Sequence, residues 1–216
     1  MRTGTSWSSG RGEPTVTLLL RHGQTPMSVQ KRYSGRSDVP LTDLGVRQAV
    51  AAAKRLASAG IGVIVTSPLL RAAQTAEEVA AVTGAPVVTD AGFRETDFGA
   101  WEGLTFAEVR ERWPDEMTAW LADPAVAPPG GESFTEVSTR VTDALRRALT
   151  GRERQTILIV SHVTPIKTLV AAALLAPPAA LYRMHLDVAA LSEIDWYADG
   201  TTVLRSFNDT GHLADE

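Results

Sequence analysis

The segment Val16-Thr17-Leu18-Leu19-Leu20 leads directly into Arg21-His22-Gly23-Gln24-Thr25. A continuous apolar and β-branched run is typical of a strand buried on both faces, as in a parallel sheet covered by helices. The polar residues that follow then lie at the C-terminal edge of the sheet, where open α/β folds bind ligands. Arginine is a forked cation that suits phosphate, histidine can attack phosphorus, and glycine allows close approach of the backbone. This stretch therefore predicts an α/β fold with an anion site.

Strand-like and helix-like segments alternate along the rest of the chain. Thr42 is a suitable N-cap for a helix that ends before Gly60, and Asp199-Gly200 suits a hairpin turn between the last two strands. The alternating order predicts a three-layer α/β/α sandwich around a mostly parallel central sheet. The further expected strands are 61–66, 86–89, 156–160, 189–197 and 202–208, and the further expected helices are 69–82, 106–112, 115–121, 134–149 and 165–175.

Composition limits the function classes. The chain has 216 residues, 44% hydrophobic and 21% charged, as expected for one soluble globular domain. A net charge of -4 gives no reason to expect nucleic-acid binding. The chain has no cysteine, which excludes disulfides, thiolate catalysis and cysteine-ligated metals and fits a reducing cytoplasm. No apolar run approaches the roughly 20 residues of a membrane span, so no membrane contact is expected.

The first 14 residues differ from the rest in composition. They are rich in Ser, Thr and Gly and contain little that a core could bury. Residues 1–14 are therefore expected to be a flexible tail or an interdomain linker, and residues 15–216 a single domain.

Four blocks of polar residues follow predicted strands or lie between predicted elements. Two strands at opposite ends of the chain finish in a histidine, His22 and His162, and the strand 61–66 leads to Arg71. A further loop, 95–103, is dense in carboxylates. Because parallel strands end at the same edge of a sheet, these groups are expected to share one site. Two arginines, two histidines and a carboxyl group suit phosphoryl transfer: cations bind the phosphoryl oxygens, an imidazole attacks, and the acid protonates the leaving oxygen.

These blocks resemble the histidine phosphatase superfamily, the family of phosphoglycerate mutases and related phosphatases. The resemblance runs from about Val16 to Asn208, and the blocks occur in the family's order. It implies a phosphoglycerate mutase-like fold and no metal or other cofactor. The blocks are Arg21-His22-Gly23-Gln24-Thr25, Ser67-Pro68-Leu69-Leu70-Arg71-Ala72-Ala73-Gln74-Thr75-Ala76, Glu95-x-x-Phe98-Gly99-x-Trp101-Glu102-Gly103 and Val160-Ser161-His162.

The resemblance also implies roles for individual residues. His22 would be the nucleophile that forms a phosphohistidine, Glu95 the proton donor, and His162 would complete the pocket. Val163 and Ser28 stand where relatives often have glycine and asparagine, and a side chain at 163 is expected to narrow the pocket or to shift the backbone donor there. The implied catalytic residues are His22, Glu95, His162, Arg21 and Arg71, and the implied substrate-binding residues are Arg21, His22, Gly23, Gln24, Thr25, Ser28, Arg71, His162 and Val163.

Several alternatives stay open at this stage. Asp97 and Glu102 lie near Glu95, and only geometry can assign the acid. The Glu95-x-x-Phe98-Gly99 form, with Thr96 where phosphoglycerate mutases have arginine, resembles acid and α-ribazole phosphatases that hydrolyse small phosphomonoesters. A mutase and a non-catalytic phosphate-binding module are the alternatives, and the oligomeric state is open. With its linker-like start, the chain also resembles the C-terminal half of bifunctional proteins whose N-terminal half is a ribonuclease H.

Other conspicuous residues have simpler interpretations. Phe98 and Trp101 are expected to pack beneath the acid-bearing loop rather than to contact substrate. Trp113 and Trp120 are expected on a buried helical face. The basic run 31–36 is expected to be a solvated loop, with contact to substrate as the alternative because it follows His22 closely. His185 and His212 are expected to be loop or surface residues.

Overall fold

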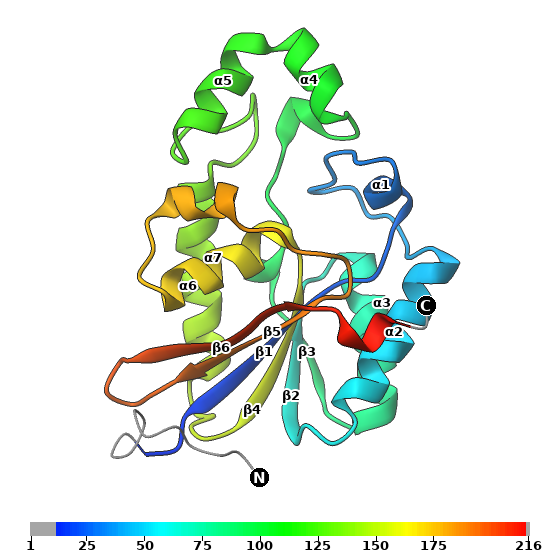
Figure 1. Cartoon of the computed structure of the whole chain (residues 1–216), viewed down its shortest axis with the longest axis vertical. Helices are drawn as coiled ribbons and strands as arrows, with labels where there is room; N and C mark the ends of the chain where they lie inside the picture. The colour runs from blue at the N-terminus through cyan, green and yellow to red at the C-terminus, as the bar shows by residue number, and fades with distance from the viewer. Residues whose placement is uncertain (1–11, 215–216) are drawn as a thin grey trace.

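A single six-stranded sheet organises the molecule, in the order β3-β2-β4-β1-β5-β6 (Figure 1). The computed structural model describes residues 12–214. Strands β1 to β4 are parallel, and β5 and β6 extend the sheet antiparallel at one side. This is the mostly parallel sheet that the sequence predicted. The strands are β1 (Thr15–Arg21), β2 (Ile61–Thr66), β3 (Val87–Thr89), β4 (Thr156–Ser161), β5 (Leu191–Trp196) and β6 (Thr202–Asp209).

Two pairs of helices cover the two faces of the sheet. Leu18 and Leu20 of β1 pack with the pair α2 and α3, whereas Leu19 packs with the pair α6 and α7. Because successive side chains of a strand point to opposite faces, the run of leucines feeds two separate cores. The three-layer sandwich is therefore present. The helices are α2 (Asp43–Leu56), α3 (Leu70–Thr83), α6 (Phe134–Leu149) and α7 (Val163–Ala173).

Helix ends follow local sequence signals. The Thr42 hydroxyl accepts a hydrogen bond from Gly45 N–H, as predicted for the N-cap of α2. Gly84, at φ 70°, ends α3 in the left-handed conformation. Helix α7 begins at Val163, two residues earlier than predicted. Pro165 does not delay this start, because the first turn of a helix makes no intrahelical use of its N–H groups.

A small cap lies beyond the C-terminal edge of the sheet, at the top of Figure 1. It consists of α4 (Phe106–Arg112) and α5 (Pro114–Ala122), which are separated at Trp113 because proline opens a new helix. The loop after β1 contains a short helix that the sequence analysis did not predict, α1 (Pro26–Val29). The 3-10 turns are η2 (Ala91–Phe93), η3 (Gly99–Trp101), η4 (Pro178–Arg183) and η5 (Gly211–Leu213).

The start of the chain lies mostly outside the described residues. Residues 12–14 have no regular structure before β1 begins, and the predicted tail or linker otherwise falls on residues 1–11, which the structure does not describe. Within residues 12–214, none of the helices has both the length and the apolar character that a membrane span needs.

Candidate active site

The two histidines lie side by side at the C-terminal edge of the sheet. Strands β1 and β4 are parallel neighbours, with Arg21 opposite Ser161. The next residue after each strand, His22 or His162, is therefore at the same position along the sheet. The ring centroids of His22 and His162 are 5.1 Å apart. The structure therefore brings together the two residues that the sequence placed at one edge.

One ring nitrogen of His22 is fixed by its own loop. Nδ1 lies 2.7 Å from the carbonyl oxygen of Gly23. Because a carbonyl can only accept, Nδ1 must carry the proton, and on a neutral ring Nε2 then has a free lone pair. Burial, followed by the charges of Arg21 and Arg71, lowers the pKa of His22 well below its ordinary 6.5. The ring is therefore neutral at pH 7, with the lone pair of Nε2 available.

His162 is oriented by two side chains. Arg71 Nε donates to its Nδ1 at 3.3 Å, so Nε2 carries the proton and donates to Ser67 Oγ at 2.7 Å. Burial and the charge of Arg71 lower the pKa of His162 well below 6.5. Both nitrogens are thus in use, and the predicted contact of His162 with phosphate stays a prediction.

The Arg71 guanidinium is nearly filled by protein acceptors. Besides His162, it donates to the carbonyls of Ser37 at 2.7 Å, Ser34 at 2.9 Å and Gly35 at 3.2 Å. A guanidinium has five N–H groups, so these four bonds leave one for a ligand. Burial lowers the pKa of Arg71, although Glu95 opposes this change. Arg71 therefore links the loop 34–37 to the histidine pair.

Arg21 is the less occupied of the two arginines. Its Nη1 donates to the carbonyl of Leu186 at 2.6 Å, while its buried Nε has no acceptor among the described residues. Burial lowers the pKa of Arg21 to about 10, so the group stays charged at pH 7. A buried donor on a cation costs free energy unless it finds an acceptor. Arg21 is accordingly suited to an anion.

Glu95 is buried, with 8% of its surface exposed, and faces the start of α7. Its carboxylate oxygens accept hydrogen bonds from the N–H groups of Val163 at 3.0 Å, Thr164 at 3.2 Å and Thr96 at 2.9 Å. Its charge acts on Arg21 and on Arg71. Val163, predicted to contact substrate, therefore contributes its backbone N–H to the placement of Glu95.

Asp97 and Glu102, the other carboxylates of this loop, are engaged elsewhere. Asp97 accepts from Gly99 N–H at 3.0 Å and pairs with Arg36 at 2.8 Å. Glu102 accepts from Gly35 N–H at 2.8 Å, Arg36 N–H at 3.0 Å and the hydroxyl of Ser37 at 2.9 Å. Glu102 thus holds the loop whose carbonyls bind Arg71. Geometry separates these two residues from Glu95.

The rest of the first motif forms the wall of the site. The side-chain oxygen of Gln24 accepts from Thr42 at 2.9 Å, at the start of α2. Thr25 and Ser28 bond each other in a capping box at α1. Gly23 N–H donates to Thr75 at 3.2 Å. These residues support the loop around His22, and their predicted substrate contacts stay predictions.

An aromatic cluster lies under the cap, next to the acid-bearing loop. Trp101 is fully buried, and its ring lies 5.4 Å from that of Trp120 and 5.9 Å from that of Tyr33. Phe98 is 4.8 Å from Tyr33. The packing roles predicted for Phe98, Trp101 and Trp120 agree with this arrangement. Trp113 is partly buried against the same cluster.

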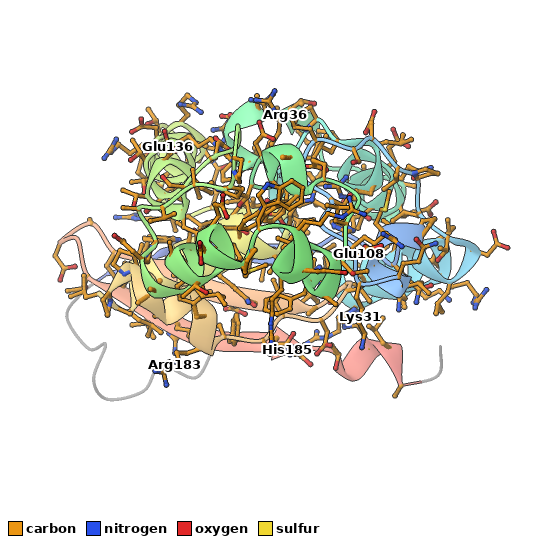
Figure 2. All side chains as sticks on the ribbon, turned by 90° about the horizontal axis from the view of Figure 1, so that it is seen from above. Lys31, Arg36, Glu108, Glu136, Arg183 and His185 are labelled. Atoms are coloured by element: carbon orange, nitrogen blue, oxygen red, sulfur yellow. The ribbon has the colours of Figure 1, made fainter. Side chains whose placement is uncertain are left out.

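The exposed residues named from the sequence lie at the periphery. Figure 2 shows Arg36 on the opposite side of the cap helices from His185. His185 pairs with Asp187 at 2.9 Å and is largely exposed, whereas His212 is partly buried and bonds the carbonyl of Ala189 at 3.1 Å. In the basic run, Arg32 pairs with Glu108 at 2.9 Å. None of these contacts reaches the histidine pair.

Several site residues were not assigned roles from the sequence. Ser67, directly after β2, accepts from His162, and its position before a proline at a strand end was the available signal. Lys167 is half-buried on α7 with Nζ 3.4 Å from the carbonyl of Leu181; burial lowers its pKa, while the charge of Glu95 opposes this. The carbonyls of the loop 34–37 had no sequence signal, because any residue supplies a carbonyl.

Known proteins resemble this chain over nearly its whole length. The family model described as histidine phosphatase superfamily (branch 1) matches residues 17–210. The bifunctional protein Rv2228c of Mycobacterium tuberculosis is 51% identical over 212 residues, 98% of this chain and 58% of the relative. This chain thus spans little more than half of that relative. The probable phosphoglycerate mutase GpmB of Proteus mirabilis is 37% identical over 205 residues, 91% of this chain and 94% of the relative.

Solved structures share the fold at similar coverage. A mycobacterial glucosyl-3-phosphoglycerate phosphatase in complex with VO3 superposes with a TM-score of 0.84 at 32% identity, over 91% of this chain and all of that chain (100%). A putative α-ribazole-5'-P phosphatase from Escherichia coli gives 0.82 at 28% identity, over 91% and 97%. The relatives therefore include proteins named phosphatases and proteins named mutases.

Proposed function

Because the chain belongs to the histidine phosphatase superfamily (branch 1), we propose that it hydrolyses small phosphomonoesters through a phosphohistidine on His22, with Glu95 as proton donor. The observation that carries this proposal is the His22 ring itself. Its Nδ1 proton is held by the Gly23 carbonyl, and its free Nε2 lies in a site with two guanidinium groups. A neutral imidazole beside two cations suits attack on a bound anion.

The first chemical step transfers the phosphoryl group to the enzyme. The lone pair of His22 Nε2 forms a bond to phosphorus while the bond from phosphorus to the leaving oxygen breaks. The leaving oxygen keeps that electron pair and takes the proton that Glu95 received from water in the second step of the preceding turnover, so the product is a neutral alcohol. Arg21, through its free buried Nε, and Arg71 offset the negative charge on the phosphoryl oxygens.

The second step returns the enzyme to its starting state. Water attacks the phosphohistidine and gives a proton to the Glu95 carboxylate, while the bond from nitrogen to phosphorus breaks and its electrons return to Nε2. Inorganic phosphate leaves. One water is consumed and one alcohol and one phosphate are formed, so Glu95 acts first as acid and then as base.

Glu95 is favoured as the acid over its two neighbours by its position. It is buried, accepts from the N–H groups of Val163 and Thr164 directly after His162, and interacts electrostatically with both Arg21 and Arg71. Asp97 and Glu102 are committed to Arg36 and to the loop 34–37. This arrangement supports Glu95 in the role that the family resemblance assigns to it.

A mutase is the second candidate, because GpmB of Proteus mirabilis, named a probable phosphoglycerate mutase, is 37% identical to this chain. Thr96, where the resemblance places an arginine in phosphoglycerate mutases, favours the phosphatase. The test is a panel of phosphorylated metabolites, aryl phosphates included, with inorganic phosphate measured against substrate consumed. One phosphate per substrate supports hydrolysis, whereas an isomeric phosphate ester without free phosphate supports the mutase. Binding without turnover of any substrate supports the non-catalytic module.

The cellular setting is also proposed. The relative named bifunctional is longer than this chain, which supports the idea that this phosphatase is fused to a second domain, an N-terminal ribonuclease H in the resemblance noted above. We place the protein in the cytoplasm, where its phosphorylated small-molecule substrates are formed, without nucleic-acid or membrane contacts of this domain. The length of the open reading frame in the source genome tests the fusion.

A further inference from the structure

We propose that Arg140 and Glu132 are positioning residues that hold Glu95 in register for proton transfer. Neither residue contacts the histidine pair, and neither belongs to the motifs singled out in the sequence. Arg140 binds backbone carbonyls up to and including that of Glu95, and Glu132 binds the backbone of Asp97, which follows it. This inference rests on the proposed role of Glu95 as the acid.

Arg140 projects from α6 and uses all of its N–H groups on this task. It donates to the carbonyls of Gly92 at 2.9 Å, Arg94 at 2.8 Å and Glu95 at 2.9 Å. Its remaining bonds go to the two carboxylate oxygens of Glu132, at 2.8 and 2.9 Å. A planar fork with five donors can make such a set, whereas an ammonium group cannot. Three carbonyls along the approach to Glu95 are therefore fixed by one side chain.

Glu132 binds the other side of Glu95. Its Oε2 accepts from Asp97 N–H at 3.0 Å, and its own N–H donates to the Asp97 carbonyl at 2.8 Å. Burial of Glu132 opposes ionisation, but the hydrogen bonds from Arg140 and from Asp97 outweigh it and lower the pKa of Glu132. The ion pair is therefore formed at neutral pH and joins the loop before α6 to the acid-bearing loop.

The close approach of these two loops depends on glycine. A Cβ built on Gly131 would overlap the carbonyl oxygen of Asp97, and one built on Gly99 would overlap that of Pro129. Ala100 N–H also donates to Pro129 at 2.9 Å. The two loops are therefore packed closely against each other and are attached to α6. Val137 of this helix belongs to the core that α6 and α7 form with one face of the sheet.

Glu95 is consequently held at both ends. Arg140 and Glu132 fix its backbone from the α6 side, and the N–H groups of Val163 and Thr164 fix its carboxylate from the α7 side. A displacement of about 1 Å is enough to cost on the order of 100-fold in a proton-transfer step. Loosening the backbone attachment is therefore expected to impair the acid without touching His22.

The test uses the leaving group as a readout. 4-Nitrophenolate leaves without a proton, whereas the phenolate of unsubstituted phenyl phosphate gains more from protonation. We compare kcat/KM on 4-nitrophenyl phosphate and phenyl phosphate, since this parameter reports the steps up to release of the first product. The variants are Arg140→Lys and Glu132→Gln, with Glu95→Gln as reference. Arg146→Lys, on the same helix in the exposed ion pair with Asp143, is the matched control.

A positioning role predicts a selective loss. Arg140→Lys and Glu132→Gln are expected to lose about 10- to 100-fold on phenyl phosphate and less than about threefold on 4-nitrophenyl phosphate. Glu95→Gln shows the same selectivity with a larger loss, and Arg146→Lys matches the wild type. Equal losses of Arg140→Lys and Glu132→Gln on both substrates, or no loss, overturn the inference. No selectivity in Glu95→Gln instead overturns the role of Glu95 in the proposed function.

Discussion

The proton positions of the two histidines decide what the site can do. The Gly23 carbonyl fixes the proton of His22 on Nδ1, and Arg71 together with Ser67 fixes that of His162 on Nε2. The Gly23 carbonyl can only accept and Arg71 can only donate, so one partner decides each assignment; the Ser67 hydroxyl can do both and accepts from Nε2. One ring is thereby left with a free lone pair, while the other supports an arginine.

The lowered pKa of His22 predicts a pH dependence of stability. In the unfolded chain His22 titrates near its ordinary value of 6.5, whereas burial and two arginines depress its pKa in the folded protein. Stability that is complete above pH 6.5 is therefore lost as the pH falls, because the unfolded state binds the proton more tightly. His22→Gln should reduce this loss by up to about 1.4 kcal/mol per pH unit below 6.5.

Urea unfolding at pH 7.5 and 5.5 measures this effect. The control is Leu121→Ala, an exposed substitution that removes no titratable group and should leave the pH slope unchanged. The same slope in wild type and His22→Gln would mean that His22 is not held neutral in the folded protein.

Among the elements, the loop 34–37 contributes to the position of Arg71 through its backbone carbonyls, which its sequence does not indicate. Glu102 holds it from one side, and its carbonyls bind Arg71 from the other. A Cβ on Gly35 would overlap the Thr96 carbonyl and a Glu102 oxygen, so Gly35→Ala should displace this loop. We expect kcat/KM to fall by about 10- to 100-fold while the melting temperature changes little.

Gly62→Ala is the matched control for Gly35→Ala. Gly62 lies on β2, away from the site, and its Cβ would meet the movable side chain of Gln155, just before β4. Full activity of Gly35→Ala would show that the loop can shift without disturbing Arg71. Steady-state kinetics on 4-nitrophenyl phosphate, with circular dichroism melting, distinguish the outcomes.

Local sequence patterns predicted the strands and the helix ends better than they predicted the contacts between distant segments. The strands predicted to end at Leu20 and Val160 each run one residue further, to Arg21 and Ser161, and Thr42 is the N-cap that its local pattern predicted. The start of α7 was predicted at Pro165, two residues after its position at Val163. Proline is compatible with any position in the first turn of a helix, so it does not mark the first residue. The use of that helix start to hold Glu95 depends on residues far apart in the chain, and no local pattern reports it.

At the scale of the whole molecule, the cap shares a third hydrophobic cluster with the acid-bearing loop and the start of α6. Trp101, Trp120 and Met117 belong to this cluster, which is separate from the cores on the two faces of the sheet. Composition and periodicity predicted one domain, but they could not show that its apolar residues divide in this way. We therefore expect the cap to loosen while the sheet stays folded.

Trp120→Ala tests this independence. Removing a buried tryptophan costs about 3 to 5 kcal/mol. We expect hydrogen exchange to accelerate in α4 and α5 with little change in β4, while Leu121→Ala, 44% exposed on the same helix, leaves both protected. Equal loss of protection in cap and sheet would mean that the molecule unfolds as one unit.

The central claim is that His22 carries the phosphoryl group and that Glu95 acts first as acid and then as base. The most direct test mixes Glu95→Gln rapidly with 4-nitrophenyl phosphate, whose leaving group needs no proton. Phosphoenzyme should form and then hydrolyse slowly, giving a burst of one nitrophenolate per site and a phosphate that mass spectrometry maps to His22. A phosphate on another residue, or turnover at the wild-type rate without a burst, would contradict this account.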